Sequence, residues 1–101
     1  MNTAKNTVVA CCQVAPKIGD LAFNRTLTER AIRSAAHQGA QIVVLPELVQ
    51  SGYVFNDRSE ALSLSETVEG PTLRLWTELA RELNIVVVGG FCERLDGDEL
   101  A

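Results

Sequence analysis

Three short apolar runs alternate with two amphipathic segments along this chain. The runs cover residues 8–14, 41–45 and 85–88, and they are rich in β-branched side chains. Runs of this kind are typical of strands that are buried on both faces of a parallel sheet. Because parallel strands need crossover connections, we predict three parallel strands that are joined by helices.

The two segments between the runs follow the period of an α-helix. In residues 21–38 the apolar side chains recur every three or four positions, and the charged side chains lie mostly off this stripe. Asp20 is placed to cap the start of this helix, and Gly39 follows its end. A second helix is predicted to begin at Pro71, since proline is tolerated at the first helical position, and to end at Asn84. The strand–helix–strand order predicts a right-handed βαβ unit.

The remaining segments are less regular. Residues 56–69 are polar, with Asp57 as the cap of a short helical turn. Residues 91–94 prolong the third strand as a half-exposed segment, and the Asp-Gly pair at residues 96–97 predicts a hairpin turn to a further strand. The chain stops where that strand would start, and two helices on one side leave a sheet face uncovered. We therefore expect an incomplete β-α-β-α-β domain that self-associates. The alternative is an intact small α/β module, in which the last predicted strand does not exist.

The composition narrows the class of protein. The chain has 101 residues, a net charge of −4, 47% hydrophobic and 22% charged residues, as in a soluble globular domain. Its basic residues are scattered, which argues against nucleic acid, and its apolar runs are far shorter than the ~20 residues that span a membrane. Three cysteines without metal spacing, and no secretory signal pattern, predict a cytoplasmic protein. Without a G-x-G-x-x-G or phosphate-binding loop, we expect no cofactor and no metal.

Glu47 is the first candidate for chemistry, because it follows Pro46 at the end of the second apolar run. Proline cannot donate to a sheet ladder, so Glu47 would lie at the carboxyl end of a buried parallel strand, where α/β sheets bind ligands. A carboxylate there can act as a general base, with its pKa raised by burial. Position alone favours a simpler interpretation, in which Glu47 reaches solvent or caps a helix. The apolar residues of the following loop, which holds Tyr53, favour instead a loop that folds back over a pocket.

A series of short motifs, taken in order, resembles the nitrilase superfamily of carbon–nitrogen hydrolases. The motifs are Val9-Ala10-Cys11-Cys12-Gln13, Gly19-Asp20, Asn24, Gly39-Ala40, Val43-Val44-Leu45-Pro46-Glu47, Ser51-Gly52-Tyr53, Glu69-Gly70-Pro71 and Val88-Gly89-Gly90-Phe91. The resemblance extends over nearly the whole chain from Val8 onward. Within the superfamily it is greatest for the aliphatic amidase and carbamoyl-amide hydrolase branches.

The resemblance implies an αββα sandwich, usually paired through its helices into a homo-oligomer. Residues 8–101 would supply the N-terminal portion of that domain, after a frayed segment at residues 1–7. It also implies a small-molecule substrate with an amide, nitrile or carbamoyl carbon. A Glu activates a Cys thiol, the thiolate forms a thioester with the substrate, and a Lys stabilises the tetrahedral intermediate. Glu47 corresponds to the Glu, and Tyr53 lies in a loop that borders the family's pocket and is a candidate substrate contact.

The lysine and the nucleophilic cysteine of the family lie beyond the positions that this chain reaches. Cys92 falls on the third strand rather than on the sharp turn that carries the nucleophile, and Cys11 and Cys12 are predicted to be small buried hydrophobes. Lys5 and Lys17 are in the frayed terminus and the first loop. We therefore expect a truncated carbon–nitrogen hydrolase that is inactive alone. A non-catalytic α/β binding or interaction module, for which the sequence offers no motif, is the second hypothesis.

Overall fold

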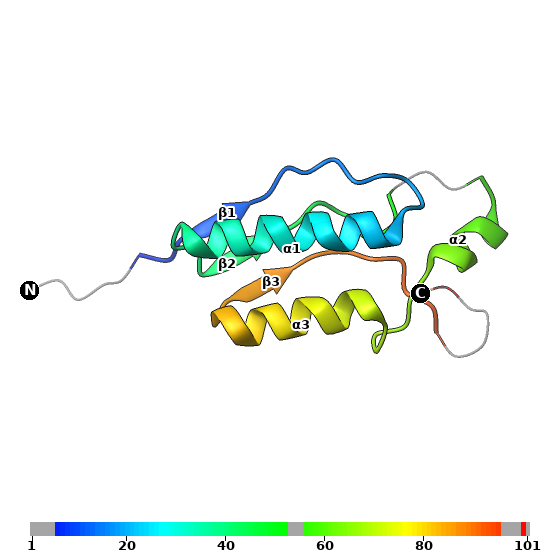
Figure 1. Cartoon of the computed structure of the whole chain (residues 1–101). Coiled ribbons are helices and arrows are strands. Elements are labelled where there is room, and N and C mark those ends of the chain that lie inside the picture. Colours follow the sequence, from blue (N-terminus) through cyan, green and yellow to red (C-terminus); the bar gives the residue numbers. More distant parts are fainter. Residues whose placement is uncertain (1–5, 53–55, 96–99, 101) are drawn as a thin grey trace, which may run out of the picture.

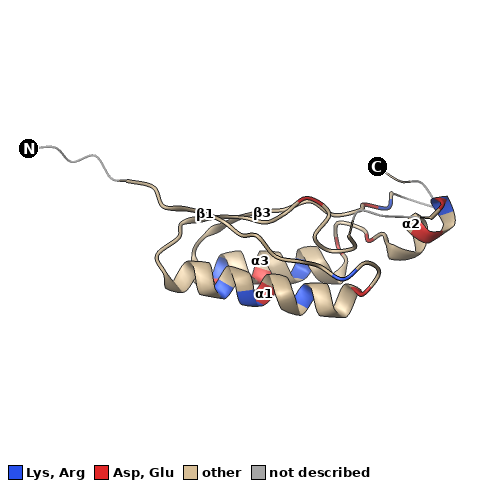
Figure 2. Ribbon diagram, turned by 90° about the horizontal axis from the view of Figure 1, so that it is seen from above, with Lys and Arg blue, Asp and Glu red and all other residues tan. Residues whose placement is uncertain are grey.

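The computed structural model of the chain describes residues 6–52, 56–95 and 100. Its elements in order are β1 (Val9–Cys11), α1 (Leu21–His37), β2 (Ile42–Val44), α2 (Arg58–Leu64), α3 (Pro71–Leu83) and β3 (Val86–Val88). The strands form one parallel sheet in the order β1-β2-β3. Helices α1 and α3 lie side by side on the same face of this sheet (Figure 1) (Figure 2). The β-α-β-α-β order expected from the sequence is confirmed.

The helices begin and end where their capping residues predict. The Asp20 side chain accepts a hydrogen bond of 3.0 Å from the Phe23 N–H at the start of α1. Asn84 ends α3 in the left-handed conformation, with φ of +54°. Asp57 caps α2 by accepting from the Glu60 N–H at 2.8 Å, so the predicted short helical turn is present as a helix.

The strands are shorter and less buried than the sequence predicts. Each spans three residues, and only β2 carries a fully buried side chain, that of Val43. Two rows of side chains point away from the helices, and in the described structure they are open to solvent or only partly covered: Val9, Ile42 and Val86 in one row, and Cys11, Val44 and Val88 in the next. We call these residues the open face. The prediction of strands buried on both faces is therefore wrong, whereas the expected uncovered sheet face is present.

Two expectations about single segments are corrected by this arrangement. Cys11 is exposed rather than buried, because its side chain belongs to the open face. Residues 91–94 are half-buried but do not continue β3, which ends at Val88; Glu93 and Arg94 instead form isolated bridges with Glu66 and Leu100. The Asp-Gly turn expected at residues 96–97 lies outside the described residues.

The hydrophobic core lies between the sheet and the two helices. Its buried members are Ile32, Ala35, Ala40, Val43, Leu45, Val49, Trp76 and Leu79. The Trp76 indole N–H donates to the Thr28 hydroxyl at 3.2 Å and so ties α3 to α1. The ring packs so closely on Gly89 that a Cβ there would lie 2.8 Å from it, which explains the glycine at this position. Among the described helices, none has the length and apolar character that crossing a membrane requires.

Candidate functional site

Glu47 lies where the sequence places it, at the carboxyl end of β2. The Leu45 N–H donates to the Val88 carbonyl at 2.8 Å, and the chain leaves the sheet at Pro46. Glu47 then opens a turn and is exposed to solvent. The expected burial of this carboxylate is therefore wrong, because the chain turns out of the sheet at this residue. An exposed carboxylate at the edge of a parallel sheet remains accessible to a ligand.

The turn after β2 packs against the chain that follows β3. A Cβ at Gly90 would lie 3.3 Å from the Leu48 nitrogen and 3.7 Å from the Glu47 Cα. Contacts of this kind are tight, so a residue without a side chain lets the two segments approach. The carboxyl ends of β2 and β3 thereby meet directly beside Glu47.

The turn itself has an unusual backbone. Leu48 adopts φ of +49°, in the left-handed region that costs a residue other than glycine about 1–3 kcal/mol. Its carbonyl accepts two hydrogen bonds, from the Ser51 N–H at 3.3 Å and the Gly52 N–H at 2.8 Å. Val49, Gln50 and Ser51 are all buried. The described part of this loop, up to Gly52, thus packs into the protein, whereas its folding back over a pocket stays a prediction.

A buried polar cluster fastens this loop to the start of α3. We call Gln50, Glu66 and Thr72 the Glu66 cluster; each is at most 6% exposed. The Glu66 carboxylate accepts hydrogen bonds from the Gln50 side-chain amide, from the Thr72 N–H at 2.9 Å and from the Thr72 hydroxyl at 2.6 Å. Because Gly70, the N-cap residue of α3, has no side chain to cap the helix, Glu66 supplies that cap from four residues upstream.

Asn24 fastens the same loop on its other side. This α1 residue is fully buried and donates from Nδ2 to the Gln50 carbonyl at 2.9 Å and to the Lys17 carbonyl at 2.8 Å. Its Oδ1 accepts from the Lys17 N–H at 2.7 Å, and the Ser51 carbonyl accepts from the Gly19 N–H at 3.0 Å. The turn that carries Glu47 is therefore held from α1 and from α3 together.

Sequence reasoning singled out Asn24 but missed Glu66 and Gln50. Glu66 lies in a polar stretch that looks like a solvated loop, Gln50 lies in the loop after Glu47, and the two residues are sixteen positions apart. The one local signal is the Gly70-Pro71 helix start, which lacks a capping side chain and so requires an acceptor from elsewhere. Tyr53, the predicted substrate contact, lies outside the described residues.

Burial disfavours the reactive thiolate form at two of the three cysteines. All three are free thiols. Burial raises the pKa of the Cys92 thiol, and burial together with the neighbouring Cys11 raises the pKa of Cys12. A raised pKa disfavours the thiolate, which is the nucleophilic form. Within the described part of the chain, no three His, Cys, Asp or Glu side chains are grouped as metal ligands would be.

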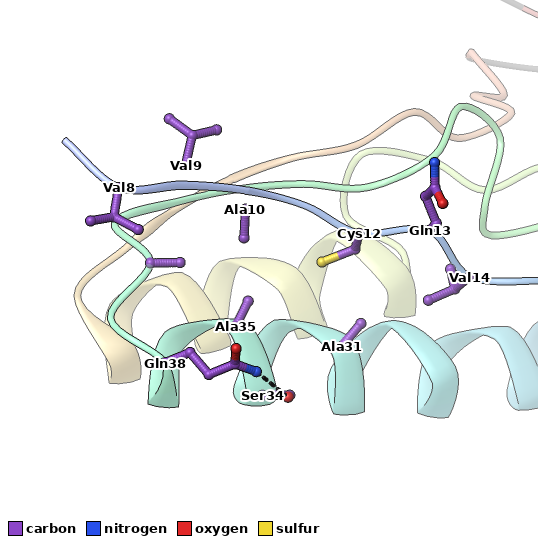
Figure 3. A pocket seen from close by; sticks show the side chains of 11 residues that line it. Val8, Val9, Ala10, Cys12, Gln13, Val14, Ala31, Ser34, Ala35 and Gln38 are labelled. Carbon is purple, nitrogen blue, oxygen red and sulfur yellow. Dashed lines mark hydrogen bonds between the residues drawn. The ribbon is translucent and has the colours of Figure 1, made fainter.

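A hollow of about 450 Å³ lies along β1, between this strand and α1 (Figure 3), and Glu47 is not among its lining residues. Its wall combines alternate residues of the β1 segment, Ala10, Cys12 and Val14, with the small side chains of Ala31 and Ala35. The described lining holds no charged side chain, and burial raises the pKa of the Cys12 thiol in it. The candidate chemistry therefore lies at the carboxyl end of β2 and not in this hollow.

The fold and the site together define a class: a parallel α/β layer with a Pro-Glu pair at the carboxyl end of its central strand. The carbon-nitrogen hydrolase family matches the chain over residues 8–100, and the chain belongs to this family.

Known relatives and a solved structure agree with this membership. The chain is 39% identical over 93 residues to a nitrilase of Pyrococcus abyssi, covering 91% of this chain and 35% of the nitrilase. It is 38% identical over 88 residues to human deaminated glutathione amidase, covering 86% of this chain and 26% of the amidase. A CN-hydrolase superfamily protein of Xanthomonas campestris superposes with a TM-score of 0.74 at 26% identity, over 87% of this chain and 31% of that protein. The chain thus spans about a third or less of these proteins.

Proposed function

We propose that Glu47 is the general base of a carbon–nitrogen hydrolase whose remaining catalytic groups lie outside this chain. The observation that carries the proposal is the Pro46-Glu47 pair at the carboxyl end of β2, in a chain of this family. In the active enzyme, Glu47 removes the proton from a cysteine thiol. Residues 8–101 would form the N-terminal portion of the hydrolase domain.

The proposed reaction proceeds through a thioester. The thiolate attacks an amide, nitrile or carbamoyl carbon, and a lysine stabilises the charge of the tetrahedral intermediate. Ammonia or an amine leaves from an amide or a carbamoyl compound. With a nitrile, addition of the thiolate gives a thioimidate, which takes up water and loses ammonia to form the thioester. Water then hydrolyses the acyl-enzyme and releases the thiol. The names of the relatives, a nitrilase and an amidase, support this range of small-molecule substrates.

The described residues support the proposal that the 101-residue chain is inactive alone. Lys17 lies in the loop after β1, where its ammonium is 4.2 Å from the centre of the Phe23 ring. Two of the three thiols, those of Cys12 and Cys92, have a raised pKa, which disfavours the thiolate. Groups that act together in catalysis lose most of the rate when some are missing.

Tyr53 is proposed as a substrate contact of the complete enzyme. It follows Gly52, whose N–H is bonded to the Leu48 carbonyl at 2.8 Å, so the loop is anchored up to the residue before it. The Tyr53→Phe substitution keeps the ring and removes the hydroxyl. A raised KM with an unchanged kcat would support a contact that stabilises the bound substrate and the transition state equally.

Self-association and a reducing compartment complete the proposal. Val9, Val86 and Val88 of the open face are 51%, 55% and 48% exposed, and apolar surface of this kind favours association. We propose that the isolated chain self-associates through this face and that the complete enzyme forms a homo-oligomer through its helices. We also propose that the protein resides in the cytoplasm, where three free thiols remain reduced. The same open face favours the second candidate function, a non-catalytic module that binds a partner chain.

Two assays test the catalytic proposal. The 101-residue chain should release no ammonia from a simple aliphatic amide above the background rate, and release that is lost on Glu47→Gln would overturn this expectation. Residues 8–100 can then replace the matching portion of the Pyrococcus abyssi nitrilase. A chimera that hydrolyses that enzyme's nitrile substrate and accumulates a thioester detectable by mass spectrometry supports the hydrolase; a folded but inactive chimera favours the binding module.

A further inference from the structure

Glu66 is a buried carboxylate for which the proposed reaction has no use. It is 6% exposed and accepts three hydrogen bonds within the Glu66 cluster. Burying a charge is costly unless it is fully bonded. A capping side chain at Gly70 is disfavoured, because a Cβ there would lie 3.0 Å from the Thr67 carbonyl oxygen and 3.0 Å from Glu66 Oε1, so Glu66 takes over that cap. Helix capping accounts for the bonds from Thr72 to Glu66 but not for the bond from the Gln50 side chain.

The cluster holds the Gln50 side chain in one orientation. Its Nε2 donates to the Glu66 carboxylate and to the Leu64 carbonyl at 2.9 Å, and its Oε1 accepts from the Cys92 N–H at 3.5 Å. Both amide hydrogens of Gln50 are thus in use, and turning the amide over would place donor against donor at Cys92. The Gln50 backbone is held as well, because its carbonyl accepts from Asn24.

This anchor lies two residues beyond the strained turn. Leu48 keeps φ of +49° although its side chain disfavours that conformation, and such a residue persists only where its surroundings over-determine it. Ser51 and Gly52, directly after Gln50, close the turn by donating to the Leu48 carbonyl. Since Glu47 immediately precedes Leu48, the direction in which Glu47 leaves the sheet depends on this turn remaining closed.

We propose that Glu66 is a positioning residue, which acts through Gln50 to keep the Leu48 turn closed and so fixes where Glu47 presents its carboxylate. The inference deepens the proposed function and rests on it, since Glu47 is the group whose position matters. It assigns Glu66 no contact with the substrate. The proposed link from Glu66 to the conformation of residues 47–52 can be measured in a chain that has no catalytic activity.

The test uses the 101-residue chain and NMR. Glu66→Gln keeps the size of the side chain but places an amide nitrogen where an acceptor is required, so the hydrogen bond from Gln50 or from Thr72 is lost. Amide hydrogen exchange at Ser51 and Gly52 reports the turn, and exchange at Val86, which donates to the Gln41 carbonyl at 2.9 Å at the other end of the sheet, reports the whole fold. The Cδ chemical shift of Glu47 reports its surroundings.

The Glu66→Gln variant is expected to speed exchange at Ser51 and Gly52 about tenfold more than at Val86, and to move the Glu47 Cδ shift. Glu69→Gln, the same change at an exposed neighbour, should alter neither.

Unchanged exchange at Ser51 and Gly52, or an equal rise at all three amides, would overturn the inference, because the second result describes a residue that supports only the global fold. If Glu66→Gln does not fold, Thr72→Val removes one hydroxyl bond to Glu66 in nearly the same volume and must shift the same signals in the same direction. A positive result together with a fully active Glu47→Gln chimera would leave the positioning intact and refute the proposed function.

Discussion

The two faces of the three-stranded sheet carry similar side chains but have different surroundings. On the covered face, Val43 is fully buried against the helices, and Trp76 of α3 is 4% exposed. On the open face, Val86 and Val88 are 55% and 48% exposed. The covered face is packed against the helices of the described structure. The open face is apolar, as a protein interface is, and no other described residues cover it fully.

Truncation of a side chain should destabilise the protein much more on the covered face than on the open face. We expect Trp76→Ala to lower the free energy of unfolding by about 3–5 kcal/mol, because a large buried ring is lost and leaves a cavity. Val86→Ala, on the open face, should change it by less than about 0.5 kcal/mol. Urea unfolding followed by circular dichroism measures both. Equal losses for the two variants would mean that the faces are equally packed and would contradict the comparison.

Charge on the open face should weaken self-association. Val88→Lys places an ammonium among apolar side chains, and we expect the dissociation constant of the oligomer to rise at least about tenfold, or 1.4 kcal/mol. Val68→Lys is the matched control, since Val68 is 54% exposed and lies outside the sheet. Sedimentation velocity over a concentration series gives both constants. A monomeric parent chain, or an equal effect of Val68→Lys, would refute association through the open face.

The smallest expected effect on stability concerns an ion pair between α1 and α3, the helices that cover the sheet. Arg33 of α1 forms an exposed ion pair with Glu82 of α3, and its guanidinium lowers the pKa of Glu82 below the ordinary 4.5. A lowered folded-state pKa contributes stability above the unfolded value, and this stability is lost as the pH falls through the folded value. Arg33→Gln should therefore lower the melting temperature slightly at pH 7 and not at pH 2. Arg30→Gln, the control, should leave the melting temperature unchanged at both pH values. A difference that persists in acid would exclude the ion pair as its cause.

Local patterns were enough to predict the order of elements. Helix α1 follows from its apolar stripe and the Asp20 cap, and the end of α3 follows from Asn84, because these signals act over a few residues. The position of Glu47 follows in the same way from Pro46. Its exposure does not, since it depends on how the chain leaves the sheet.

Features that depend on distant contacts could not be predicted. An apolar run does not tell whether one or both faces of a strand are covered, which is why β1 and β3 were expected to be buried. Glu66 looked like part of a polar loop, because its partner Gln50 is far away in the sequence. The role of Tyr53 stays a prediction.

The most direct test of the central claim is the acylation rate of the chimera that carries residues 8–100. If Glu47 is the general base, Glu47→Gln should slow thioester formation about 1,000-fold with little change in substrate binding. Glu69→Gln, an equivalent change at an exposed position, should leave the rate within about twofold of the parent chimera. A Glu47→Gln chimera that forms the thioester at the parent rate would contradict the assignment of Glu47.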